Sequence, residues 1–114
     1  MFDFEKLDLY KKAKSFNADV RILIKSTRLD PTTKDQLRRA SFSIVLNIAE
    51  GSGRFSNRDR RHFYIISRSS MFESIAILDV LRDEGIIDNS TFQKFYLHAE
   101  EISKMLFSMI KNLS

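Results

Sequence analysis

Apolar residues recur at intervals of three and four along most of the chain, which is the spacing of one face of an α-helix. Short stretches containing Gly, Pro, Asp and Ser divide this pattern into four segments. We expect helices over roughly 4–27, 33–51, 57–83 and 91–110. The expected inner faces are Leu9, Ala13, Phe16, Val20 and Leu23 or Ile24; Leu37, Ala40, Ser41, Ile44 and Ile48; Phe63, Ile66, Ser70, Ser74, Ile77 and Leu81; and Phe92, Phe95 or Tyr96, Ala99, Ile102, Met105 or Leu106, and Met109.

Residues suited to helix ends lie between these segments. Gly51 is expected to end the second helix in a left-handed conformation, and Gly85 to end the third. The expected N-terminal caps are Asp3, Thr32 or Thr33, Ser56 or Asn57, and Ser90. Connections this short make neighbouring helices antiparallel. The sequence therefore predicts one all-α domain over residues 1–114, an antiparallel up-down-up-down four-helix bundle.

The second and third segments each carry an additional apolar stripe. A helix with two stripes is either deeply buried or offers a second surface that needs a partner. We therefore expect the bundle to self-associate through Phe42, Val45, Leu46, Ala49, Ile65, Phe72 and Ala76.

A line of polar residues separates the two stripes of the second helix, and Glu73 falls at the corresponding seam of the third. We interpret Arg39, Ser43, Asn47, Glu50 and Glu73 as a satisfied structural polar seam; the alternative is a ligand groove. Glu50 precedes Arg54 by four residues, the favourable order for a helical ion pair. Glu73 is expected to reach Arg39 across the two helices.

Composition is that of a single globular domain, with 114 residues, 43% hydrophobic and 30% charged. The charged first residues do not resemble a signal peptide, and no run approaches the roughly 20 apolar residues that span a bilayer. We expect a cytoplasmic protein with no membrane partner. The absence of Cys excludes disulfides and thiolate metal sites.

Positive charge is concentrated around the second turn. Between Arg38 and Arg68, seven Arg stand against Glu50 and Asp59, which is 7 − 2 = +5, whereas the whole chain carries +4. Arginine binds phosphate through two donors at once, and a helix N-terminus attracts anions. Phe55, His62 and Tyr64 supply rings for stacking on unpaired bases. The candidate nucleic-acid-binding residues are Arg54, Arg58, Arg60, Arg61 and Arg68; an ordinary solvated surface is the alternative.

No catalytic motif or cofactor motif is present, so we expect neither an enzyme nor a cofactor. His62 and His98 are the two histidines. In an antiparallel pair of helices His98 lies level with Ala76, about 21 Å from His62 at 1.5 Å per residue. That separation argues against a shared metal ion, and a nuclease remains a distant alternative.

The stretch from Gln36 to Glu73 resembles the four-helix-bundle family encoded in intervening sequences of bacterial 23S rRNA genes. The resemblance rests on Gln36-Leu37-Arg38-Arg39-Ala40, Ser43-Ile44, Asn47-Ile48-Ala49-Glu50-Gly51, Arg54, Ser56, Phe63, Ser70 and Glu73. Val45 departs from the small residue or proline usual there. The resemblance implies a barrel-shaped homopentamer. A similar bundle is the accessory protein of diversity-generating retroelements, which partners a reverse transcriptase and nucleic acid; that is an analogy of fold.

The sequence thus favours a non-enzymatic homo-oligomeric scaffold that binds RNA or DNA. The alternative is an adaptor that binds only protein partners, with the arginine turn as ordinary surface. Salt dependence separates the two, because phosphate contacts are strongly weakened by salt.

Overall fold

The computed structural model describes all residues from Met1 to Ser114. A short 3₁₀ helix is followed by four α-helices and no strand: η1 (Asp3–Lys6), α1 (Asp8–Ser26), α2 (Pro31–Ser52), α3 (Asn57–Asp83) and α4 (Asn89–Asn112). The all-α prediction is confirmed, and the bounds of the third helix match those expected. The molecule measures 44 × 22 × 21 Å.

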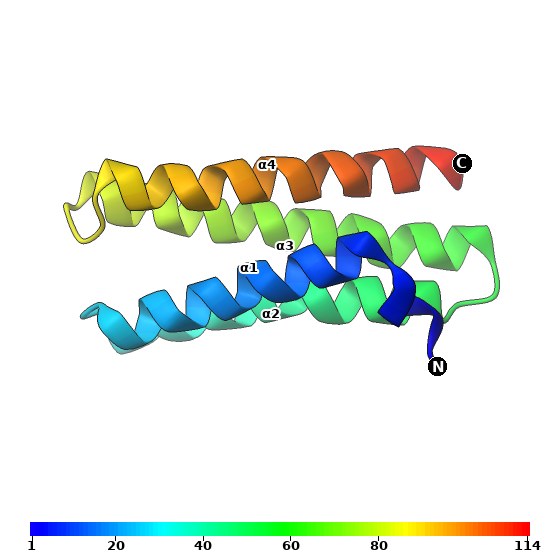
Figure 1. Ribbon diagram of the computed structural model, residues 1–114, viewed down its shortest axis with the longest axis horizontal. Helices are drawn as coiled ribbons and strands as arrows, with labels where there is room; N and C mark the ends of the chain where they lie inside the picture. The colour runs from blue at the N-terminus through cyan, green and yellow to red at the C-terminus, as the bar shows by residue number, and fades with distance from the viewer.

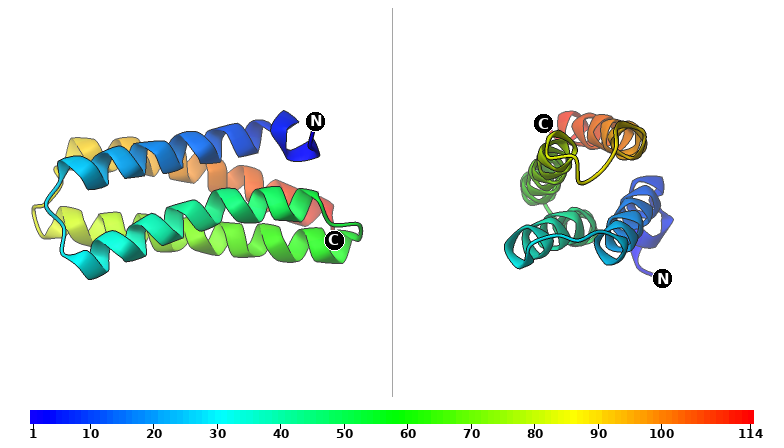
Figure 2. Two further views of the ribbon diagram at one scale, coloured as in Figure 1. Left: turned by 90° about the horizontal axis from the view of Figure 1, so that it is seen from below. Right: turned by 90° about the vertical axis from the view of Figure 1, so that its left-hand side faces the viewer.

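Each connection reverses the direction of the chain, so that helices adjacent in sequence lie side by side (Figure 1). Seen from the end, the four helices surround a common axis, and α4 also contacts α1 (Figure 2). The α2–α3 connection lies at the same end of the bundle as both termini, and the other two connections lie at the opposite end (Figure 1). No helix combines the length and apolar character that crossing a membrane requires.

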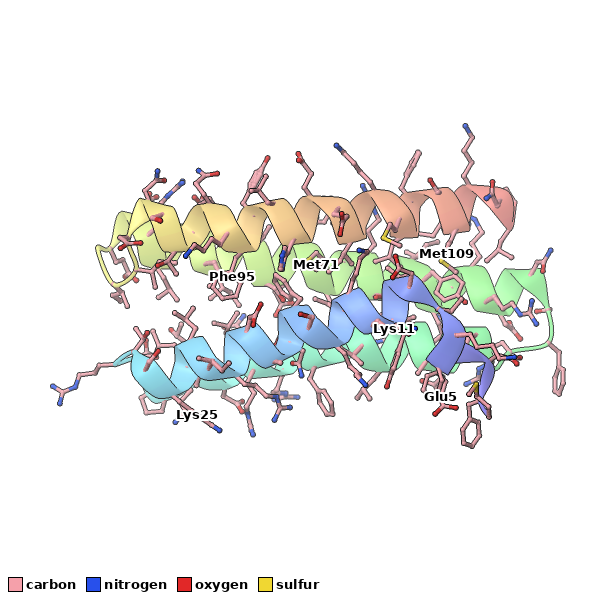
Figure 3. All side chains as sticks on the ribbon, viewed as in Figure 1. Glu5, Lys11, Lys25, Met71, Phe95 and Met109 are labelled. Atoms are coloured by element: carbon pink, nitrogen blue, oxygen red, sulfur yellow. The ribbon has the colours of Figure 1, made fainter.

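The core fills the space between the helices, as Met71 and Phe95 illustrate (Figure 3). The expected inner faces of three helices are confirmed, with Ile24, Phe95 and Leu106 buried where alternatives had been open. Leu23, Met105 and Met109 pack at the margin of the core. Periodicity alone therefore located most of the core.

The inner face of α3 differs from the prediction. Ser74 and Leu81 are buried as expected, but Phe63, Ile66, Ser70 and Ile77 are only half-buried. The buried positions are Tyr64, Ser67, Met71, Ser74, Leu78 and Leu81. The cause is the close approach of α2, where the buried Ser67 hydroxyl donates a hydrogen bond to the Ile44 carbonyl at 2.8 Å.

Three of the expected caps are wrong. Asp30 caps α2 by accepting from the Thr33 N–H at 2.9 Å, and Asp88 caps α4 by accepting from the Thr91 N–H at 2.7 Å. Proline suits the first helical position, so α2 begins at Pro31, earlier in the sequence than expected. Asp3 begins the 3₁₀ helix instead of capping α1. Ser56 is confirmed as the cap of α3, accepting from the Asp59 N–H at 3.0 Å.

Hydrogen bonds to these two caps also affect their acidity. The Thr33 hydroxyl, then its N–H, hold the pKa of Asp30 below its ordinary value. The Thr91 N–H has the same effect on the pKa of Asp88. Both carboxylates are therefore charged at the N-termini of α2 and α4, where the helix dipole favours an anion.

Of the two glycines expected to end helices, one does so and the other does not. Gly85 has φ +75°, and the Ile86 N–H donates to the Leu81 carbonyl at 2.9 Å, which ends α3 as predicted. Gly51 instead lies inside α2, whose last residue is Ser52. A Cβ at Gly51 would lie 2.9 Å from Cε1 of Tyr64, so this position is glycine because the tyrosine ring packs on it. The left-handed conformation expected at Gly51 is wrong.

Candidate nucleic-acid interface

The turn between α2 and α3 is held by hydrogen bonds from both sides. The Gly53 N–H donates to the Glu50 carbonyl and the Arg54 N–H to the Gly51 carbonyl, both at 3.2 Å. On the α3 side, Nε of Arg60 donates to the Arg54 carbonyl at 2.6 Å. Together with the Ser56 cap, these bonds hold the backbone of the turn from both helices.

Arg54 is engaged within the turn. Its Nη2 lies 3.0 Å from Oε1 of Glu50, which confirms the expected ion pair. Its guanidinium also lies 4.5 Å from the centroid of the Phe63 ring. Two partners on two helices therefore orient this side chain.

Arg60 lies beside Tyr64, whose relative exposure is only 3%. Burial raises the pKa of the Tyr64 phenol, and the positive charge of Arg60 opposes that rise in pKa. The ring of Tyr64 packs on Gly51 and cannot stack on a base. The expectation that Tyr64 joins the interface is therefore wrong.

Arg58 and Arg61 are the arginines that the turn leaves free. Both are exposed on the first turns of α3, and neither forms a hydrogen bond or ion pair within the chain. They follow a helix N-terminus that is capped by a neutral hydroxyl. Free guanidinium groups beside a helix N-terminus suit an anionic ligand.

Arg68 lies on the same side of α3 as Arg61, but its guanidinium turns toward α4. Its Nε donates to the Ser103 carbonyl at 3.2 Å, and its guanidinium lies 4.8 Å and 5.6 Å from the rings of Phe72 and Phe107. Arg68 and Arg61 thus border a groove of about 300 Å³ between α3 and α4, lined also by Ile65, Ser69, Phe72, Phe107 and Ile110. We call it the α3–α4 groove.

The positive charge is less concentrated than the sequence suggested. Arg38 and Arg39 both lie 3.5 Å from the carboxylate oxygens of Asp35, near the start of α2. The 14 residue steps from Arg38 to the end of α2 at Ser52 separate them from the turn by about 21 Å of helix. The turn itself carries four Arg against Glu50 and Asp59, which is 4 − 2 = +2.

The residues expected to form one polar seam also fall into separate groups. Ser43 and Ser70 share a hydrogen bond of 2.9 Å, and the Asn47 amide donates to the Ser43 carbonyl at 2.8 Å. Glu50 and Glu73 are both exposed, so neither acid is buried in the seam. Glu73 forms no ion pair with Arg39, whose guanidinium lies 3.5 Å from the carboxylate of Asp35 on the same helix. Arg39 and Glu73 instead border an open hollow of about 580 Å³.

The second apolar stripes do not form one continuous patch. On α2, Phe42 lies under the guanidinium of Arg21 from α1, at 5.0 Å. On α3, Phe72 faces α4 in the α3–α4 groove. Val45 is 5% exposed and belongs to the core, so its assignment to a surface is corrected. The stripes therefore lie on two flanks of the bundle, separated by the Ser43–Ser70 seam. On the flank of α2, Leu46 is exposed and Ala49 is half-buried. On the flank of α3, Ile65 and Ala76 are exposed.

The two histidines are both exposed. His62 lies at the start of α3, with its ring 5.4 Å from that of Phe63. His98 lies on α4 beside Lys12 and Glu101, which are 3.3 Å apart. No three His, Asp or Glu side chains converge as a group that could hold a metal ion.

The fold defines the chain as an all-α four-helix protein. Its sequence matches the family described as 23S rRNA-intervening sequence protein over residues 5–108, and the chain belongs to that family. The resemblance seen in the sequence is thereby confirmed.

A solved structure has the same fold. It is a protein of unknown function from the S23 ribosomal protein family of Bacteroides thetaiotaomicron, with a TM-score of 0.86 and 24% sequence identity. The match covers 90% of this chain and 98% of the other. No curated protein matches the chain. At this identity the likeness concerns the fold alone.

Proposed function

We propose that the protein is a non-enzymatic, homo-oligomeric scaffold that binds RNA or DNA through the arginines of the α2–α3 turn. The observation that carries this proposal is the pair of free guanidinium groups, Arg58 and Arg61, on a turn whose other arginines are held by the chain. A fixed turn lowers the entropic cost of binding, since little of it must be ordered on contact. Arg68, anchored on α4, contributes from the side.

Self-association is the second part of the proposal. The flank of α2 exposes Phe42 and Leu46, and the α3–α4 groove exposes Phe72 and Phe107. Two different apolar flanks suit a contact in which one flank of a subunit meets the other flank of the next, and repetition of such a contact forms a ring when the rotation between subunits closes. The family resemblance adds the expectation of five subunits. A ring would repeat the arginine turn around its axis.

The binding test is fluorescence anisotropy with a labelled structured RNA and a matched DNA duplex across a salt series. The logarithm of the affinity is expected to fall by about 0.7–0.9 per phosphate contact for each tenfold increase in salt. The double variant Arg58→Ala/Arg61→Ala should weaken binding and lower that slope by about two contacts. Arg38→Ala is the matched control, because it removes an arginine that Asp35 already pairs.

Absence of binding at low salt would overturn the nucleic-acid proposal and favour the adaptor that binds only protein. RNA incubated with Mg²⁺ and the protein should stay intact; cleavage that depends on the protein would overturn the non-enzymatic part.

The oligomer is tested by light scattering coupled to size-exclusion chromatography. Phe72→Asp places a charge in the α3–α4 groove and should reduce the mass to that of a smaller species while helix content, measured by circular dichroism, is retained. Ile22→Asp, at an exposed position of α1 that lines neither flank as defined above, is the control. An unchanged mass for Phe72→Asp would mean that the groove is not an interface between copies.

A further inference from the structure

Phe55, at the tip of the α2–α3 turn, differs from every other exposed Phe or Tyr side chain in the molecule. Its relative exposure is 102%, so it touches nothing within the chain. Each of the others lies against a ring or a guanidinium: Phe2 on Phe4, Phe42 on Arg21, Phe72 and Phe107 on Arg68, and Tyr96 on Phe92. Single exposed apolar residues are common on proteins, but complete exposure of a phenylalanine with no local partner is the exception here.

The ring is nevertheless held in a defined place. The carbonyl of the preceding residue, Arg54, accepts the hydrogen bond from Arg60, and the following residue, Ser56, caps α3. The backbone on both sides of Phe55 is therefore fixed, and the side chain projects from a rigid support. Such an arrangement costs little further ordering when a planar ligand stacks on the ring.

The surroundings of the ring indicate the charge of that ligand. Arg54 adjoins Phe55 in sequence, and the free guanidinium groups of Arg58 and Arg61 follow within two helical turns. An apolar pocket of a protein would match the ring but not the arginines. A phosphodiester chain with an accessible base matches both, because its phosphates pair with arginine while its base stacks on the ring.

Accessibility of the base is the decisive requirement. Bases within a duplex are already stacked on each other, so an aromatic side chain finds a free face only on an unpaired base. Of the three rings near the turn, Tyr64 is buried and His62 lies against Phe63, with ring centroids 5.4 Å apart. Phe55 alone is fully exposed and has no ring beside it.

We infer that Phe55 stacks on an unpaired nucleobase, so that the arginine turn recognises single-stranded RNA or DNA in preference to duplex. This inference rests on the proposed nucleic-acid function and adds the class of nucleic acid to it. The arginines supply attraction to any polyanion, and the ring supplies the preference for unpaired bases.

The test measures binding of one labelled oligonucleotide of about 16 nucleotides, near the upper end of known site sizes, as a single strand and annealed to its complement. The single strand is made as RNA and as DNA, and inorganic polyphosphate serves as a polyanion without bases. Phe55→Ala should lower the affinity for the single strands by about 5- to 150-fold, the range expected for loss of one stacked base. Affinity for the duplex and for polyphosphate should not change.

Variants at the same position separate stacking from apolar contact. Phe55→Trp should retain single-strand binding, and Phe55→Leu should lose it, since leucine is apolar but has no π-face. Because Phe55 has no contacts within the chain, all three variants should fold with unchanged melting temperatures. Equal effects on RNA and DNA would indicate that the base alone is recognised; an effect on RNA only would add a contact to the 2′-hydroxyl.

The outcomes also distinguish the two proposals. If the wild-type protein binds none of these ligands, the proposed function fails. If it binds all of them and Phe55→Ala binds them equally well, the function stands and the stacking inference is wrong. If Phe55→Ala changes the mass of the oligomer, the ring contacts a second copy of the chain, which also overturns the inference.

Discussion

The contact between α2 and α3 and the contact between α1 and α4 both join neighbouring helices, yet they are built from different side chains. Between α2 and α3, Gly51 receives the ring of Tyr64, and the Ser67 hydroxyl reaches the backbone of α2. Between α1 and α4, the rings of Phe16 and Phe95 meet edge to face, with centroids 5.8 Å apart. Two hollows of about 400 and 220 Å³, both lined by His98, lie at the edge of this contact.

The difference shows how the bundle positions its arginine turn. Small side chains let two helices approach closely and fix their relative placement through hydrogen bonds to the backbone. Large aromatic side chains supply buried area instead. The α2–α3 turn lies at the end of the closely packed pair, so Arg58 and Arg61 are positioned by the small residues of that pair.

The largest expected effect tests the contact between α1 and α4, which is stabilised by buried aromatic area. Phe95→Ala should lower the free energy of unfolding by about 3–5 kcal/mol, because it removes a buried ring and leaves a cavity against Phe16. Chemical denaturation measures this loss. Leu97→Ala, at an exposed position two residues further along α4, should change stability by no more than about 0.5 kcal/mol. Similar losses for both would mean that the Phe16–Phe95 contact does not hold α1 to α4.

The next effect concerns close approach. Gly51→Ala should lower the free energy of unfolding by about 1–3 kcal/mol, because the new Cβ would lie 2.9 Å from Cε1 of Tyr64 and 3.1 Å from Cβ of Phe63. The matched control is Gly53→Ala, where the nearest atom is 3.6 Å away and φ is −89°. This control should be neutral or should stabilise the protein by about 0.4–1 kcal/mol. A stabilised Gly51→Ala would refute the close packing of Tyr64.

A smaller effect isolates the hydrogen bond between the two helices. Ser67→Ala removes the donor to the Ile44 carbonyl and should cost about 1 kcal/mol, or a few degrees in the melting temperature. Ser69→Ala, on the exposed face of the same helix, controls for helix propensity. Equal melting temperatures for the two variants would show that the buried hydroxyl adds nothing to the α2–α3 contact.

The smallest effect concerns the outer surface of the same pair. Glu73 is exposed and unpaired, so Glu73→Ala should change stability by no more than about 0.5 kcal/mol. The sequence predicts instead an ion pair between Glu73 and Arg39, and breaking such a pair would lower stability. A loss of several degrees on thermal unfolding would restore that pairing and contradict the position of Glu73 in the structure.

Local patterns in the sequence predicted the parts of the fold that depend on local chemistry. The bounds of α3, its Ser56 cap, the left-handed Gly85 and the Glu50–Arg54 pair all depend on residues near in sequence. The start of α2 differs from the prediction because Pro31 occupies the first helical position and Asp30, not a threonine, is the cap. Asp30, Thr32 and Thr33 are all suitable caps, and the sequence pattern does not distinguish between them.

What the sequence could not supply was the relative placement of helices. A helical wheel shows two apolar stripes on α3 but not which side α2 approaches, so the burial of Ser67 was missed. For the same reason Arg38 and Arg39 were grouped with the arginines of the turn, although Asp35 pairs with them at the far end of α2. Charges close in a sum over the sequence need not be close in space.

The chemistry of the helix caps differs between the two ends of the bundle. Asp30 and Asp88 cap their helices with carboxylates at the end opposite the arginine turn, whereas Ser56 caps α3 with a hydroxyl. An aspartate at position 56 would accept the same backbone hydrogen bond, and it would also bring a full negative charge beside Arg58. A single capping residue can therefore change the electrostatic potential of the surface at this end of the molecule without altering the helix that it caps.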